Sequence, residues 1–129
     1  MSIPKELFYT TSDEWIRKEE DGSVVIGITD YAQSQLGEIL HVDLPDTDIE
    51  IDAGDDVCMI ESVKTAVDIY APIAGMIIEV NSDLEEMPTC INNDPYGDGW
   101  LFKLQPISEG DCDNLLDADA YQEHIDERE

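Results

Sequence analysis

The chain has 129 residues, of which 42% are hydrophobic, and its 32 acidic and 6 basic residues give a formal net charge of −26. This length predicts one domain spanning residues 1–129, with enough apolar side chains for a packed core. So few basic residues argue against nucleic acid and anionic membranes as partners, because both require Lys and Arg on the binding surface.

Most of the chain predicts β-strands. Strand-type residues bounded by turn residues occur at 14–18, 24–28, 38–44, 57–60, 66–71, 76–80 and 100–104. The dipeptide Asp21-Gly22 between the first two segments is typical of a tight hairpin. Pro72 and Gly75 predict a turn between the fifth and the sixth. The side chains expected to face the core in these two segments are Val67, Ile69, Ala71, Met76, Ile78 and Val80.

Two other segments predict helices. Asp30, with a Gln three positions later, is a helix-capping pattern, and Gly37 is typical of the position just after a helix. From Asp113 the pattern becomes helical again, with Asp117 as a candidate cap. The apolar face of this second helix would consist of Leu116, Ala120, Tyr121 and Ile125. Residues 82–99, rich in turn residues, predict irregular structure with one helical turn.

The cysteines and the chain start bear on the cellular compartment. Cys58, Cys90 and Cys112 are an odd number and contain no CxxC pair, which argues against a disulfide framework and a metal site. Cys58 lies in an apolar run and is expected to be a small core residue. The first residues lack signal-peptide and transit-peptide patterns, and no segment is apolar enough to span a membrane. We therefore expect a cytoplasmic protein.

Lys64 is the only Lys or Arg between Lys18 and Lys103. The flanking strands would pair as a hairpin with residues 62–65 at its tip, a place where groups are presented on a rigid scaffold. The tip contains no Gly, Asn, Asp or Pro, and such departures from turn chemistry collect at functional sites. A catalytic lysine needs burial or a neighbouring cation, whereas Glu61 is the nearby charge, so acylation of the amine is favoured over catalysis by it. An ordinary surface lysine also fits this spacing.

The stretch ESVKTAVDIYAPIAG, residues 61–75, resembles the lipoyl-attachment hairpin of the glycine cleavage system H-protein family. The blocks GSVVIGITDYAQSQLGEI, HVDLP, NNDPYGDGWLFKL and LLDADAY are similar to the family in the same order, so the resemblance covers nearly the whole chain. Lipoyl domains of 2-oxo acid dehydrogenases typically carry DKA at the attachment site, and biotin carriers carry MKM. One departure is Asp48, which stands about where the family usually has a glycine.

The resemblance implies a mainly β fold, the barrel-sandwich hybrid of lipoyl carriers, with two antiparallel sheets, a short N-terminal helix and a C-terminal helical extension. It implies a monomeric carrier rather than an enzyme, with lipoate in amide linkage on Lys64 to carry an aminomethyl intermediate and reducing equivalents. Glu61, Ser62 and Val63 would help enzymes to recognise the tip. The implied partners are a pyridoxal-phosphate glycine decarboxylase, a tetrahydrofolate-dependent aminomethyltransferase and a dihydrolipoyl dehydrogenase, together with a lipoate ligase or octanoyltransferase.

Alternatives remain open at this point. A lipoyl relay that supplies 2-oxo acid dehydrogenases would have the same attachment site. The acidic stretches DLPDTDIEIDAGDD and NNDPYGDG suggest a calcium-binding module, although neither follows the ligand order of an EF-hand loop. An independent enzyme would need a nucleophile beside His41 or His124, and both are expected to be surface or boundary residues.

Overall fold

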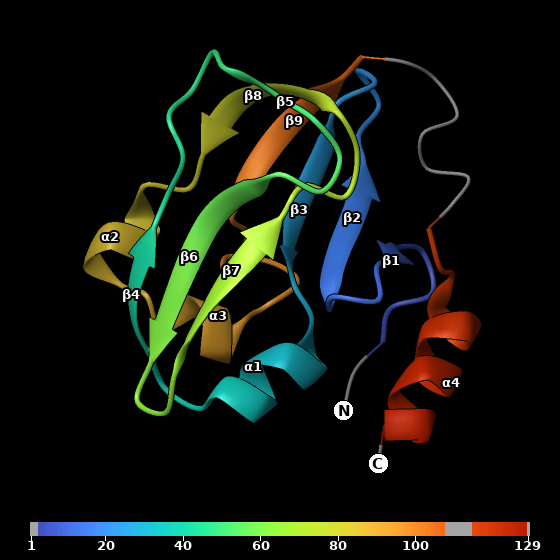
Figure 1. Cartoon of the computed structure of the whole chain (residues 1–129), viewed down its shortest axis with the longest axis vertical. Coiled ribbons are helices and arrows are strands. Elements are labelled where there is room, and N and C mark those ends of the chain that lie inside the picture. Colours follow the sequence, from blue (N-terminus) through green and yellow to red (C-terminus); the bar gives the residue numbers. More distant parts are fainter. Residues whose placement is uncertain (1–2, 108–114, 129) are drawn as a thin grey trace.

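The computed structural model describes residues 3–107 and 115–128. Its strands are β1 (Phe8–Tyr9), β2 (Glu14–Lys18), β3 (Val24–Ile28), β4 (Ile39–Asp43), β5 (Glu50–Ile51), β6 (Asp56–Ser62), β7 (Ala66–Tyr70), β8 (Gly75–Val80) and β9 (Phe102–Pro106). Its helices are α1 (Asp30–Leu36), α2 (Asp83–Glu86), α3 (Cys90–Asn93) and α4 (Ala118–Arg128). The strands form a six-stranded sheet in the order β1-β2-β3-β9-β8-β5 and a three-stranded sheet in the order β4-β6-β7 (Figure 1). The paired strands are antiparallel, which confirms the expected mainly β fold with two antiparallel sheets.

The main core joins the two sheets. The buried strand residues of this cluster come from both and include Ile16, Ile26, Ile28, Val42, Ile60, Ile69, Ile77 and Leu104. Removing this apolar surface from water is the main force that holds two sheets face to face. Ile69 and Ala71 are buried and Val67 packs against the cluster, so the predicted inward face of β7 is confirmed.

A second apolar cluster attaches the C-terminal helix to the outer side of the six-stranded sheet (Figure 1). The rings of Tyr9 and Tyr121 stack with centroids 4.7 Å apart. The Tyr121 hydroxyl also shares hydrogen bonds with Thr29 Oγ1 at 2.6 Å and Asp13 Oδ1 at 2.9 Å. Tyr9 lies on β1, Asp13 directly before β2 and Thr29 directly before α1, so Tyr121 ties α4 to all three places.

The N-terminal cap of α4 is the residue that the sequence predicts. Asp117 Oδ1 accepts a hydrogen bond from the Ala120 backbone N–H at 2.8 Å, which confirms the predicted cap. The expected position of Leu116 on the helix face is wrong, because this residue precedes the helix and forms a β-bridge with Tyr9. At 11 residues α4 is the longest helix described, and no helix in the described part of the chain has the length and apolar character to cross a membrane.

The first helix, α1, follows three strands and is capped one residue earlier than predicted. Thr29 is the N-cap, and its side chain accepts a hydrogen bond from the Ala32 N–H at 3.2 Å. Asp30 is instead the first helical residue and accepts a hydrogen bond from Gln33 Nε2 at 2.8 Å. The Asp30 cap is therefore wrong, since the preceding threonine offers the same chemistry. Gly37 ends the helix with a φ of +79°, as predicted.

The predicted inward face of β8 is wrong in its first half. Ile77 is fully buried, whereas Met76 and Ile78 are 36% and 39% exposed. The pairing with β9 shifts between Ile77 and Glu79, so that Ile78 is an extra residue in the ladder. Such a bulge breaks the two-residue alternation on which the prediction depended. Val80, beyond the bulge, packs against the core as expected.

The segment between β8 and β9 contains two short helices, α2 and α3, where the sequence predicts one helical turn. Asn81 holds the end of this segment, because its Nδ2 donates to the carbonyl oxygens of Asp98 and Trp100, each at 2.8 Å. As a result β9 begins at Phe102, two residues later than the predicted segment 100–104, and continues to Pro106.

Two backbone positions explain features of the sequence. Asp48 has a φ of +64°, the left-handed region in which glycine is common and aspartate is tolerated. This accounts for a glycine at that position in the resembled family. Gly75 is required for a different reason than the predicted turn: a Cβ there would lie 2.6 Å from the Gln105 carbonyl oxygen on the neighbouring strand.

Candidate functional site

The hairpin of β6 and β7 presents Lys64 at its tip, at the lower end of these strands in Figure 1. Glu61 pairs with Ala66 at the end of the ladder, and residues 62–65 make the connection. The Lys64 side chain is exposed. The predicted hairpin is therefore confirmed.

Ser62 forms the turn that the sequence of the tip does not predict. Its backbone N–H donates to the Thr65 carbonyl oxygen at 2.7 Å. Its hydroxyl oxygen accepts hydrogen bonds from the N–H groups of Lys64 and Thr65, each at 3.2 Å, and donates to the Thr65 carbonyl oxygen at 3.2 Å. These bonds use the one donor and both acceptor sites of the hydroxyl. A buried serine thus replaces the usual Gly or Asn of a tight turn.

The tip also rests on the end of α1. The Val63 N–H donates to the Glu38 carbonyl oxygen at 3.0 Å, and the Val63 side chain is 58% exposed. A methyl group built on Gly37 would meet Val63 Cγ2 at 3.4 Å and Lys64 Cε at 3.5 Å. The stem of the lysine therefore lies beside Gly37 before its amine reaches solvent.

The charges around the tip leave the lysine amine accessible. In residues 3–107 and 115–128, the one ion pair with nitrogen and oxygen within 4.0 Å joins Arg17 and Glu19. No carboxylate of the described residues therefore lies within 4.0 Å of the Lys64 amine. Glu61 is exposed at the end of β6, directly across from His41 on β4. An exposed primary amine on a fixed turn can be acylated by an external enzyme.

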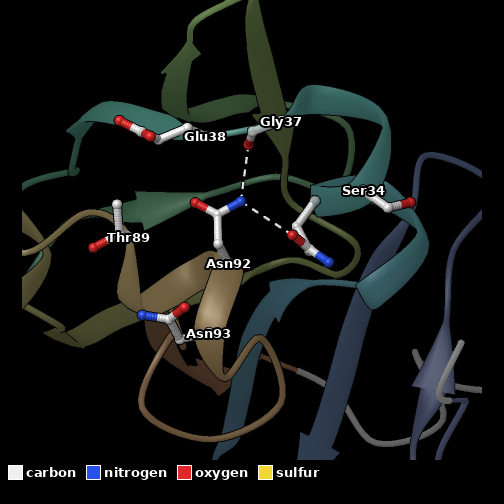
Figure 2. A pocket seen from close by; sticks show the side chains of 7 residues that line it. Ser34, Gly37, Glu38, Thr89, Asn92 and Asn93 are labelled. Atoms are coloured by element: carbon white, nitrogen blue, oxygen red, sulfur yellow. Dashed lines mark hydrogen bonds between the residues drawn. The ribbon is translucent and has the colours of Figure 1, made fainter.

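The four predicted site residues are contiguous but differ in exposure. Lys64, Val63 and Glu61 face solvent, whereas Ser62 is buried in the turn. Sequence reasoning missed Asn92 on α3, whose side chain reaches the backbone that supports the tip (Figure 2). No local pattern could reveal it, since its partners are more than fifty positions away along the chain.

Glu14 is a second residue that sequence reasoning missed, because the sequence shows it only as the first residue of a predicted strand. Its carboxyl is 1% exposed, and Oε1 accepts the Thr10 hydroxyl at 2.6 Å. Oε2 has no hydrogen-bond partner in the described part of the chain. Burial raises the pKa of Glu14 from 4.5 to about 7.

The described cysteines and histidines differ in their exposure. Cys58 is 5% exposed, as predicted for a core residue, and burial, with a smaller effect of the Asp43 charge, raises the pKa of its thiol to about 12. Cys90 is half-buried, and Cys112 lies outside the described residues. His41 is exposed and His124 is half-buried, as expected. Among the described residues, no three His, Cys, Asp or Glu side chains are grouped to hold a metal ion.

Comparisons with known proteins agree over almost the whole chain. A family model described as Glycine cleavage H-protein matches residues 7–128. A glycine cleavage system H protein of Coxiella burnetii is 51% identical over 124 residues, covering 96% of this chain and 95% of that one. One from Thermus thermophilus is 52% identical over 126 residues, covering 98% of both. The chain belongs to the glycine cleavage H-protein family.

Structural comparison gives the same family. The crystal structure of a glycine cleavage system H protein from Mycobacterium marinum matches with a TM-score of 0.85 and 37% identity, over 98% of both chains. The glycine cleavage H-protein family is the lipoyl-bearing shuttle of the glycine cleavage system, and it works with the other components of that system. Its members are carriers and not catalysts.

Proposed function

We propose that this chain is a non-enzymatic carrier of glycine cleavage and that Lys64 holds lipoate in amide linkage. The observation that carries this proposal is the exposed Lys64 amine on a hairpin tip fixed by Ser62, within the sequence ESVK. The tip fits the group, because the amine has no carboxylate partner in the described residues and its stem leaves the surface beside Gly37. When bound, lipoate supplies a reducible disulfide at the end of a flexible arm.

The residues of the chain then serve to present and release that arm. Ser62 keeps the backbone of the tip in one conformation, so that an attaching enzyme meets a preformed shape. The exposed side chains of Glu61 and Val63 are the groups at the tip that such an enzyme could recognise. A tether of this kind raises the effective concentration of the carried group at each partner's active site.

The partners that the proposal requires are three enzymes. They are a pyridoxal-phosphate glycine decarboxylase, a tetrahydrofolate-dependent aminomethyltransferase and a dihydrolipoyl dehydrogenase, and a lipoate ligase or octanoyltransferase would load the carrier. We further propose that the chain acts in the cytoplasm as a monomer, with residues 1–129 forming one domain.

The decisive experiment is intact-mass analysis and peptide mapping of the protein from its native host. We expect one lipoyl adduct, located on Lys64. In a reconstituted system, Lys64→Arg should keep the charge and the fold but abolish glycine cleavage, because a guanidinium group does not form the amide. Lys103→Arg, on β9, is the matched control and should retain both adduct and activity. An adduct on Lys103 or a biotin adduct would refute the assignment, and so would full activity of Lys64→Arg.

A further inference from the structure

An asparagine on α3 holds the backbone that leads from α1 to β4. Asn92 Nδ2 donates to the Gly37 carbonyl oxygen at 2.8 Å and to Gln33 Oε1 at 3.0 Å. Asn92 Oδ1 accepts a hydrogen bond from the backbone N–H of Ile39 at 2.9 Å. Figure 2 shows this side chain between α1 and α3, in an open pocket of about 410 Å³. Both donors of the amide and its acceptor are therefore engaged with one short segment.

The peptide group between Glu38 and Ile39 connects this asparagine to the hairpin tip. Its N–H, on Ile39, bonds to Asn92, and its carbonyl oxygen, on Glu38, accepts the N–H of Val63 at 3.0 Å. A trans peptide group is planar and points its N–H and its C=O in opposite directions, so an orientation imposed on one is imposed on the other. Asn92 thus acts through one rigid peptide on the residue that precedes Lys64.

The same side chain also fixes the surface beneath the lysine. Gly37 leaves α1 with a φ of +79°, and its carbonyl group lies beyond the last helical turn, where a partner from outside the helix is needed. Asn92 is that partner. Because the Lys64 stem lies beside Gly37, the support of the lysine and the conformation of the tip depend on one amide group.

We infer that Asn92 is a positioning residue for the modification of Lys64. This inference rests on the proposed attachment of lipoate to Lys64 and adds the residue that presents the lysine to the attaching enzyme. Such an enzyme binds the tip in one backbone conformation, so its apparent affinity falls by the fraction of molecules in other conformations. Asn92 keeps most molecules in the conformation of the tip that the enzyme binds, through its bonds to the backbone that supports the tip.

The test compares two asparagines that make similar bonds. Asn92→Ala removes the link to the tip, and Asn81→Ala removes an amide that donates to two backbone carbonyl groups near β9. Each variant is acylated by a lipoate–protein ligase with lipoate and ATP, and the KM and kcat for the carrier are measured. We expect Asn92→Ala to raise KM about tenfold, the effect of about one lost hydrogen bond, with kcat changed less than about twofold. Asn81→Ala should leave both constants near those of the wild type.

Amide hydrogen exchange gives a readout that does not depend on the ligase. The Val63 amide should exchange about tenfold faster in Asn92→Ala than in the wild type. The Ile77 amide, which is bonded to the Ile49 carbonyl oxygen, serves as a reference. Its exchange rate should change no more in Asn92→Ala than in Asn81→Ala. If the alanine variant does not fold, Asn92→Ser has the same expected results, because a hydroxyl is too short to bridge both sides of the segment.

Unchanged KM and unchanged Val63 exchange in Asn92→Ala would overturn the inference. An equal rise of KM in Asn81→Ala would also overturn it, since the effect would then follow from lower stability alone. Failure of the wild-type protein to accept lipoate on Lys64 would instead refute the proposed function. The exchange rates would still decide whether Asn92 orders the tip.

Discussion

The buried Glu14 carboxyl should make this protein less stable as the pH rises through neutrality. Burial raises the pKa of Glu14 from 4.5 to about 7, against the lowering effect of the hydrogen bond from the Thr10 hydroxyl. The charge of the neighbouring Asp13 adds a smaller upward effect. Because the side chain is 1% exposed, solvent does not screen this environment.

The sign follows from which state holds the proton. Between a pH of 4.5 and about 7, Glu14 is protonated in the folded protein and ionised in the unfolded chain. Its contribution to stability is therefore complete below pH 4.5 and is lost as the pH rises through about 7. Each tenfold change in proton affinity corresponds to about 1.4 kcal/mol, so the whole loss amounts to about 3 kcal/mol. Glu14→Gln keeps the shape without the charge and should avoid this loss.

Urea unfolding at about pH 5 and about pH 8, followed by tryptophan fluorescence, measures this effect. Relative to the wild type, Glu14→Gln should gain about 2 to 3 kcal/mol of unfolding free energy between these two conditions, because a small part of the loss has already occurred at about pH 5. Glu50→Gln, exposed on β5, removes one charge from the same acidic background and should show no such gain. An equal difference between Glu14→Gln and the wild type at both pH values would refute the reasoning, because the carboxyl would then ionise alike in both states.

Three further predictions concern the core, the strand pairing and the charge. Ile69→Ala should lower the unfolding free energy by about 3 kcal/mol, and Val67→Ala, at a half-buried position, by about 1 kcal/mol. No loss of stability in Ile69→Ala would mean that the other face of β7 points to the core. Gly75→Ala should cost about 2 kcal/mol or more, because its Cβ would meet the Gln105 backbone at 2.6 Å, and an unchanged melting temperature would contradict that contact. The KM of the glycine decarboxylase for the loaded carrier should rise between 0.1 M and 1 M salt, because the Debye length falls from about 10 Å to about 3 Å. A KM that does not change with salt would indicate that docking does not depend on charge.

Local sequence patterns were sufficient where the local chemistry decides the structure. The strands β2 and β3 occupy the predicted residues 14–18 and 24–28. Their turn contains Gly22 with a φ of +90°, a conformation that glycine adopts at little cost. The cap at Asp117 was equally readable, because capping requires only a side chain three residues from its donor.

The errors in β8 and β9 occurred where pairing between distant segments decides the structure. The register shift opposite β9 turns Ile77 inward and leaves Ile78 as an extra residue, although the sequence of β8 alone favours the other face. Likewise β9 begins at Phe102 because Asn81 binds the preceding turn from another segment. A pattern within one strand contains no information about such partners.

The candidate site divides in the same way. Lys64 could be found from the sequence, because a short motif surrounds it. The turn made by the Ser62 hydroxyl was not expected, since serine at this position is a weak turn signal. Asn92 could not be found at all, because its role depends on bonds to Gly37 and Ile39 across the fold.

Lys64 is the single positively charged side chain on a hairpin that belongs to an acidic sheet. The three-stranded sheet of β4, β6 and β7 carries exposed acidic side chains and has no Lys or Arg in its strands; these acids are Asp43, Asp56, Glu61 and Asp68. Acylation of Lys64 would remove the one positive charge of this hairpin and leave a surface of a single sign. A partner with a basic rim would then attract the loaded carrier at long range without needing a tight complex. Such docking suits a carrier that must leave each partner again, and the salt dependence of KM measures it directly.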